Sequence, residues 1–179
     1  MSDKSVTDSE ISSSLQEALK SLRPTLRRAM DLSDQDVSAV IVEPILSALG
    51  WDVRNPRQAR RPEGANLRLL SSGKPSMTVC SISSLEAIPS SLNEISPDSG
   101  EWIVVTNGQD WNIFNQNHPA QPFRSLSIKD AASQKDSVPV LAMLARDSFQ
   151  KDGLTEAWMS EAVDRDIERI LARHLDGSQ

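Results

Sequence analysis

The chain has little of several features that mark whole classes of protein. It contains one cysteine, which excludes an internal disulfide and fits a reducing compartment. No apolar run approaches the length of a membrane span, and the first ten residues, MSDKSVTDSE, are too polar for a signal peptide. We therefore expect a cytoplasmic protein that makes no use of a membrane.

An excess of basic residues is also lacking. The 179 residues include 19 Lys and Arg against 25 Asp and Glu, which gives a net charge of −6. Proteins that bind nucleic acid without sequence preference usually present a basic face, so binding of that kind would need a local basic patch here.

Hydrophobic residues make up 38% of the chain, enough for one domain with a substantial core.

Charge is absent from one stretch in the middle of the chain. Residues 75–84, PSMTVCSISS, follow a turn that contains Gly73 and carry no charged side chain. Their alternation predicts a strand with Met77 and Val79 on one face and Thr78, Cys80 and Ile82 on the other. Such a strand is either an ordinary core strand or one from which functional charges are missing.

Two helices are predicted in the first 50 residues. The first has an apolar stripe and contains Pro24, which should kink or split it near Arg23. The second begins at the N-cap Ser33, contains Pro44 and should bend there, and ends at Gly50. The stripes are Ile11, Leu15, Leu19, Leu22 and Leu26 in the first helix, and Val37, Val40, Ile41, Ile45 and Leu49 in the second.

Strand patterns follow the second helix. WDV (51–53), ANLRLL (65–70) and MTVCSI (77–82) predict three strands, of which the last two form an antiparallel hairpin. EWIVVTNGQDWNIF (101–114) predicts a second hairpin with Asn107 and Gly108 at its tip. Residues 84–95 could hold a short helix between the hairpins, and further helices are expected around 137–149 and 155–175.

This order of elements predicts an α/β (α+β) fold. An αβββαβ core with a mixed sheet is flanked by N- and C-terminal helices. We expect a disordered tail over 1–10, an N-terminal helix over 11–32, the core over 33–128, and C-terminal helices packed on the core over 129–179.

Two local motifs give the core a family resemblance. VEPILSALGWDVRNP is followed by PEG and, after the first hairpin, by WIVVTNGQDWNIF. Together they resemble the N-terminal nuclease domain of type I restriction enzyme motor subunits, and more closely the small stand-alone bacterial and phage proteins built on it. The resemblance runs from about residue 11 to 175 and includes IERILARHL near the C-terminus.

That family is similar to the PD-(D/E)xK nucleases, which implies a restriction-endonuclease-like fold and the place of an active site. In that family, two carboxylates on the second and third core strands hold a divalent metal ion. A lysine two residues after the second carboxylate helps to orient or activate the attacking water. Here Asn66 stands at the Asp position, Cys80 at the Glu and Ile82 at the Lys. Gln35 stands where relatives carry a further Glu in the first helix. The resemblance therefore implies a catalytically degenerate pseudoenzyme without a metal or other cofactor.

Three functions stay open on these grounds. A protein without nuclease activity could bind DNA or a partner protein. A metal-dependent DNA nuclease could use a migrated Mg²⁺ or Mn²⁺ site built from Glu63, Lys74 and Glu86, with Asp52 nearby, although surface pairing explains such charges more simply. A homo-oligomeric interaction module could pair its terminal helices through an apolar patch of Leu154, Trp158 and Met159.

Basic residues cluster where a nucleic acid could be held. Five arginines could bind phosphates, or could simply be solvated and paired with Asp52 and Glu63. A second cluster, Arg23, Arg27 and Arg28, lies on the first helix and has the same two interpretations. The five are Arg54, Arg57, Arg60, Arg61 and Arg68.

The remaining reactive or aromatic side chains favour structural roles. Cys80 is best interpreted as a small buried apolar side chain, because no Cys-His pair is suggested. His118 and His174 are isolated and make no metal motif. The four tryptophans are expected to be core or half-buried anchors: Trp51, Trp102, Trp111 and Trp158.

Overall fold

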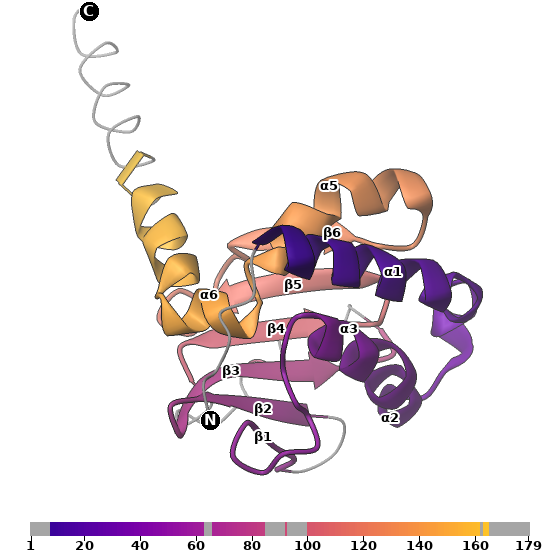
Figure 1. Ribbon diagram of the computed structural model, residues 1–179, viewed down its shortest axis with the longest axis horizontal. Coiled ribbons are helices and arrows are strands. Elements are labelled where there is room, and N and C mark those ends of the chain that lie inside the picture. The colour runs from indigo at the N-terminus through magenta and orange to yellow at the C-terminus, as the bar shows by residue number, and fades with distance from the viewer. Residues whose placement is uncertain (1–7, 63–65, 85–91, 93–99, 162, 165–179) are drawn as a thin grey trace, which may run out of the picture.

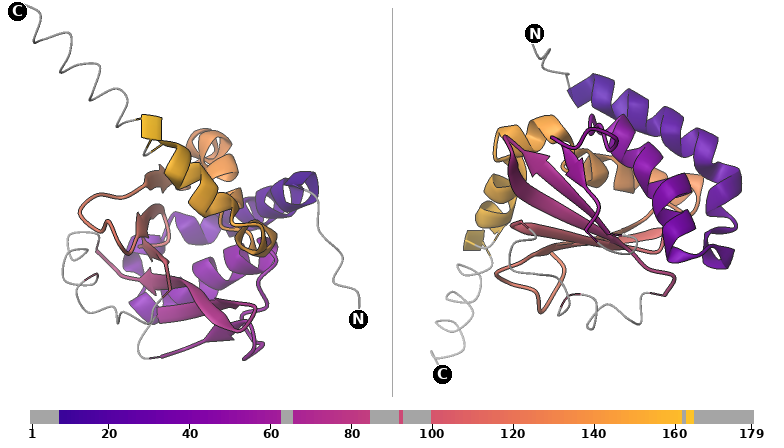
Figure 2. Two further views of the ribbon diagram at one scale, coloured as in Figure 1. Left: turned by 90° about the vertical axis from the view of Figure 1, so that its left-hand side faces the viewer. Right: turned by 90° about the horizontal axis from the view of Figure 1, so that it is seen from below.

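The protein forms a six-stranded mixed sheet with helices on one face (Figures 1 and 2). The computed structural model describes residues 8–62, 66–84, 92, 100–161 and 163–164. The strands lie in chain order across the sheet, and all neighbours are antiparallel except β3 and β4, which are parallel. This confirms the predicted fold class. The strands are β1 (Ala59–Arg60), β2 (Asn66–Ser71), β3 (Lys74–Ser81), β4 (Trp102–Thr106), β5 (Asp110–Asn115) and β6 (Arg124–Ser127).

The helices come from both ends of the chain. Residues 153–161 and 163–164 are also helical, after α6. Helices α1, α3 and α5 cover one face of the sheet, with α1 lying against both of the others. Their bounds are α1 (Asp8–Leu26), a 3₁₀ turn (Ala29–Asp31), α2 (Asp34–Val37), a π-helical turn (Ser38–Val42), α3 (Glu43–Ala48), α5 (Ala131–Ala142) and α6 (Arg146–Gln150).

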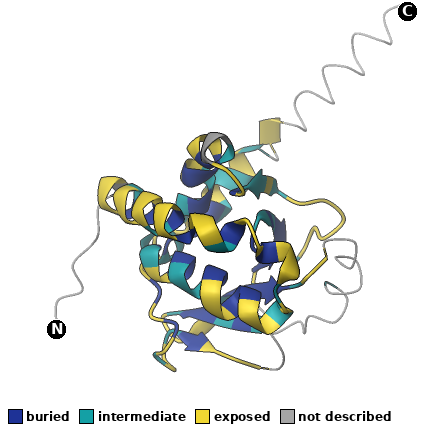
Figure 3. Ribbon diagram, turned by 90° about the vertical axis from the view of Figure 1, so that its right-hand side faces the viewer, coloured by how far each residue is buried: buried dark blue, intermediate teal, exposed yellow. Residues whose placement is uncertain are grey.

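Helix α1 buries its predicted stripe but differs from the prediction at both ends. It begins at Asp8, within the segment expected to be a disordered tail, and it is not split at Pro24. Pro24 lies in the last turn, where its missing N–H removes only one hydrogen bond before the helix ends at Leu26. Exposed residues follow the outer side of this helix (Figure 3).

The predicted second helix is three joined segments. Ser33 caps its start, because the Ser33 side chain accepts a hydrogen bond from the Asp36 N–H at 3.2 Å. A π-helical turn, Ser38–Val42, lies just before Pro44, which stands in the first turn of α3, where a missing N–H costs little. The π-helical turn shifts the helical phase, so Val40 is 42% exposed and the prediction that it belongs to the buried stripe is wrong.

Gly50 ends this helix as predicted. It has φ +86°, its N–H bonds to the Ser47 carbonyl at 3.1 Å, and the Trp51 N–H bonds to the Leu46 carbonyl at 3.0 Å. These are the two bonds of a Schellman cap. The chain therefore turns sharply at Gly50 and carries Trp51 into the core.

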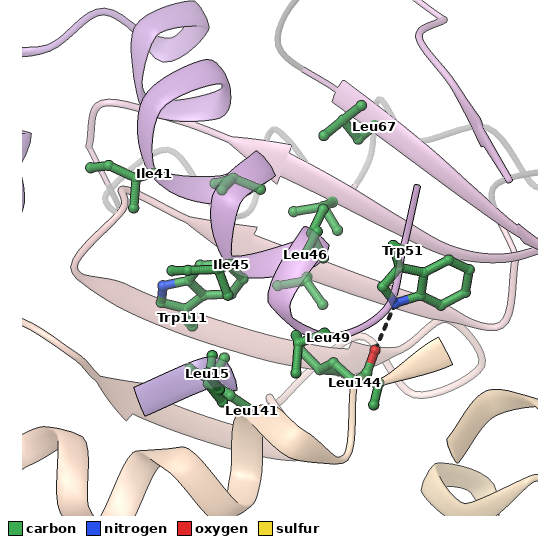
Figure 4. Close-up of a cluster of buried hydrophobic side chains, with 14 of the residues drawn as sticks. Leu15, Ile41, Ile45, Leu46, Leu49, Trp51, Leu67, Trp111, Leu141 and Leu144 are labelled. Atoms are coloured by element: carbon green, nitrogen blue, oxygen red, sulfur yellow. Dashed lines mark hydrogen bonds between the residues drawn. The ribbon is translucent and has the colours of Figure 1, made fainter. Parts of the chain in front are cut away.

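One predicted strand is absent, and two observed strands were not predicted. Residues 51–53 form no strand, because the Trp51 backbone N–H completes the helix cap and the Asp52 carbonyl accepts from the Asn55 N–H in a turn. The Trp51 indole N–H donates to the Leu144 carbonyl at 2.9 Å (Figure 4). The edge strand is instead Ala59–Arg60, which begins eight residues after Trp51 and pairs with Leu69 and Arg68. Strand β6 was not predicted, since its sequence RSLS is short and largely polar.

Both predicted hairpins are confirmed. Ser72 (φ 51°) and Gly73 (φ 79°) form the first turn, so β3 begins at Lys74, inside the stretch expected to be the turn. In the second turn the Asn107 side-chain carbonyl accepts from the N–H groups of Gln109 and Asp110, at 3.0 and 2.8 Å. Short polar side chains that bond to nearby N–H groups favour such turns.

The sheet has a large core on its helix-bearing face and a small one on the other. Met77 and Val79 belong to the large cluster, whereas Cys80 belongs to the small one, which confirms the predicted alternation. Figure 4 shows the centre of the large cluster, where side chains from α1, α3 and α5 meet Trp51 and Trp111. The small cluster is Cys80, Ile103, Val105 and Phe114, with Ile82 and Leu92 packed against it.

The C-terminal helices differ from the predicted ranges. Helix α5 begins six residues earlier than expected, because the Asp130 side chain caps it by accepting from the Ser133 N–H at 2.8 Å. The chain then turns at Met143–Ala145 before α6. Among the described residues, no helix is both long enough and apolar enough to cross a membrane.

Candidate functional site

Three of the four positions implied by the nuclease resemblance meet at one end of the sheet. The register of β2 and β3 places Asn66 directly opposite Cys80. Both side chains lie on the face away from the helices, because their neighbours Leu67 and Val79 belong to the helix-side cluster. Ile82 packs against the same small cluster as Cys80.

The fourth position is not part of this group. Gln35 is exposed and belongs to α2, which packs with the helices on the other face of the sheet. Its side chain therefore does not share a face with Asn66 and Cys80.

These residues do not fit a hard divalent cation. An amide carries no charge, and the Cys80 side chain is only 3% exposed among Ile103, Val105 and Phe114. Burial raises the pKa of the Cys80 thiol from 9.0 to about 12, so it is neutral at physiological pH. Mg²⁺ and Mn²⁺ prefer charged oxygen ligands, and a neutral buried thiol is neither a suitable ligand nor a reactive nucleophile.

The buried thiol gives a direct prediction. At pH 8 the native protein should react with a disulfide reagent such as DTNB at least about 1000-fold more slowly than the urea-unfolded chain, because its thiolate is scarce and inaccessible. The contribution of Cys80 to stability should be complete below pH 9 and should decrease as the pH rises toward 12, where the unfolded thiol ionises first. A native rate close to the unfolded rate would contradict the placement of Cys80.

Of the residues proposed for a migrated metal site, the structure describes only Lys74 and the nearby Asp52. Lys74 begins β3, six residues from Cys80, and strand geometry puts the two about 20 Å apart. Glu63 and Glu86 lie outside the described residues. Within the described ranges, no three His, Cys, Asp or Glu side chains are grouped closely enough to hold a metal ion.

Two of the five arginines form a cross-strand pair beside the Asn66–Cys80 pair. Arg60 in β1 lies directly opposite Arg68 in β2, and Arg68 in turn lies opposite Thr78. This face is again the one away from the helices, since Ala59 and Leu69 are in the helix-side core. Arg68 Nε is buried, and it has no hydrogen-bond acceptor within the described chain.

The other three arginines are exposed in or next to the loop that contains β1. Arg61 forms an ion pair with Glu43 at 2.8 Å, and not with the predicted Asp52. Arg54 and Arg57 have their backbone N–H groups bound by the side chains of Asp52 and Asn55. Arg23, Arg27 and Arg28 are also exposed, but only Arg23 lies on the first helix, because α1 ends at Leu26.

The apolar patch predicted on the C-terminal helix has a different composition. Leu154 is 1% exposed and belongs to the core, so it cannot be part of the patch. Met159 and Val163 are 56% and 57% exposed on the same helix. Trp158 packs edge-on against Trp102 and lies 5.1 Å from the ring of His118, which is in a loop as expected. His174 lies outside the described residues.

The tryptophans are core or half-buried anchors, as predicted. Trp51, Trp102 and Trp111 are each no more than 1% exposed, and Trp158 is partly buried.

A bidentate ion pair between Arg124 and Glu161 joins the last helix to β6. The sequence holds no local signal for this pair, because the two residues are 37 positions apart.

Comparison with protein-family models, with curated proteins and with solved structures found no match for this chain. The resemblance to the restriction-enzyme domain therefore rests on the two motifs of the sequence.

Proposed function

We propose that the protein is a nuclease-like module without nuclease activity, which binds nucleic acid through phosphate contacts on the sheet face away from the helices. The observation that carries the proposal is the Arg60–Arg68 pair. Like charges directly opposite each other destabilise a sheet, and neither side chain has an acidic partner among the described residues. An anion placed between them would remove that repulsion.

Phosphate is the anion that this pair suits best. A guanidinium group presents five N–H donors in a planar fork that matches two phosphate oxygens. Arg68 Nε lacks an acceptor within the described chain, so it has unused donor capacity beside Arg60. Phosphate contacts also require no charged catalytic residue, which agrees with the replacement of carboxylates by Asn66 and Cys80.

The proposal is tested with the double variant Arg60→Gln, Arg68→Gln. Fluorescence anisotropy with a labelled DNA duplex, repeated over a series of NaCl concentrations, should show binding that weakens about tenfold or more in the variant. Each lost phosphate contact should lower the salt slope by about 1, so the slope should decrease by about 2.

A matched control makes the same change of charge at the opposite edge of the sheet. Lys129 and Lys135 are exposed near β6 and α5, and Lys129→Gln, Lys135→Gln should leave affinity and slope nearly unchanged. Equal losses in both pairs would mean that bulk charge, not the arginine pair, governs binding. Absence of binding by the wild type to duplex and single strand would overturn the proposal.

Self-association through the C-terminal helix is a second candidate. Met159 and Val163 are four residues apart, so they lie on one side of the helix, and both are more than half exposed. Light scattering should report a larger species for the wild type than for Met159→Lys if this patch joins two copies. A monomeric wild type would exclude this candidate.

A further inference from the structure

A cavity of about 320 Å³ opens at the end of the sheet far from Cys80. Three parts of the chain line it: the β2–β3 hairpin, the start of β4, and residues 149–155, which run from the end of α6 into the last helix. Its lining includes Ser72, Lys74, Glu101, Phe149, Asp152 and Thr155. The volume is at the lower end of the range for small-molecule sites.

Backbone strain is concentrated at this cavity. Ser72 (φ 51°) and Asp152 (φ 53°) are the two non-glycine residues with positive φ in the described parts of the chain, and both line it. Ser72 occupies a hairpin position that favours Asn or Gly, and Asp152 follows the cap of α6, where Gly is usual. Strained backbone that carries a polar side chain is typical of binding sites.

The charges of the lining are not neutralised by ion pairs. Lys74, Glu101 and Asp152 form no ion pair with a described residue, although Glu101 accepts 3.4 Å hydrogen bonds from Asn115 and Thr155. Lys74, Glu101 and Asp152 are all exposed residues, so the open rim of the cavity carries two carboxylates and one ammonium group. A complementary ligand needs two cationic groups and one anionic group.

We propose that this cavity binds a small basic amino acid. Its two cationic groups would contact Glu101 and Asp152, and its carboxylate would contact Lys74. The partly exposed ring of Phe149 provides an apolar surface for the aliphatic chain of such a ligand and a π-face for its cationic end. The site is independent of the arginine pair, so neither proposal depends on the other.

The test uses L-lysine and cadaverine, which is lysine without its carboxylate, in calorimetric titrations of the full chain. The wild type should bind L-lysine with 1:1 stoichiometry and more tightly than cadaverine. Glu101→Gln and Asp152→Asn should each weaken L-lysine binding about tenfold, the usual scale for a lost charged contact. Glu17→Gln, an exposed position on α1, is the matched control and should bind like the wild type.

Two further variants separate binding from folding. Lys74→Met should abolish the preference for L-lysine over cadaverine, because only the carboxylate of lysine contacts Lys74. Asp152→Gly should melt at a higher temperature than the wild type, since it relieves the positive φ, and yet should bind L-lysine about tenfold more weakly, like Asp152→Asn. The proposal is overturned if L-lysine at about 10 mM, a weak-binding concentration, gives no heat, or if all variants bind it equally.

Discussion

The triple variant Asn66→Asp, Cys80→Glu, Ile82→Lys should be less stable than the wild type in EDTA and should regain stability when Mn²⁺ is added. Cys80 is 3% exposed and lies opposite Asn66, so the two new carboxylates would be close together and one would be buried. Burial of an uncompensated carboxylate costs several kcal/mol, and we expect a loss of about 3 kcal/mol in EDTA.

Mn²⁺ should offset this loss, because carboxylates at the directly opposite positions 66 and 80 can both bind one divalent cation. Binding at 100 times the dissociation constant would restore about 2.7 kcal/mol. Thermal melts in EDTA and in Mn²⁺ provide the measurement. The resemblance thus predicts that the melting temperature of the triple variant rises when Mn²⁺ is added.

The matched control keeps the shape and removes one charge. Asn66→Asp, Cys80→Gln, Ile82→Lys should melt at the same temperature with and without Mn²⁺. If the folded triple variant shows no more response to Mn²⁺ than this control, the assignment of Asn66 and Cys80 to the nuclease positions is wrong. Calorimetric titration of the wild type with Mn²⁺ should show no stoichiometric binding.

Gly100→Ala should destabilise the protein by about 3 kcal/mol or more, since it adds a steric clash to an unfavourable φ. Gly100 has φ +98°, and a Cβ atom there would lie 2.7 Å from the Ser76 carbonyl carbon and 3.0 Å from the Met77 nitrogen. These are backbone atoms of β3, which cannot move without disturbing its parallel pairing with β4.

Gly73→Ala is the matched comparison. Gly73 also has positive φ, +79°, but no atom lies within 4 Å of its added Cβ. It should therefore show only the conformational cost, about 1 kcal/mol. Urea unfolding of the two variants measures both free energies, and similar losses would mean that contact with β3 contributes little at Gly100.

The sequence predicted those elements whose signals are local. The α1 stripe, the Ser33 cap, the Gly50 terminus and both hairpins follow from residues a few positions apart. By contrast, β1 forms at Ala59–Arg60 because Leu69 and Arg68 are available to pair with it, and nothing in its own two residues indicates a strand. Strand β6 was missed for the same reason.

The candidate sites divide in the same way. The pairing of Asn66 with Cys80 follows from the hairpin that the sequence predicted. The Arg60–Arg68 pair depends on strand β1, which was not predicted. The sequence therefore could not show which two of the five arginines lie opposite each other. The cavity near Lys74 is built from segments about 80 residues apart, and its one sequence-level signal is Asp152 beside Gly153 at the end of a helix, where the glycine would be the expected cap residue.

The hydrogen bond from Trp51 to the Leu144 carbonyl has a consequence for how the chain is made. It joins positions 93 residues apart, and Leu144 belongs to the same core cluster as the N-terminal helices. At 5–20 residues per second, a ribosome needs roughly 5–20 s to synthesise that interval. During this time the apolar faces of α1 and α3 have no C-terminal partner. Folding of the nascent chain should therefore finish late in translation, after the segment that contains Leu144 has left the ribosome.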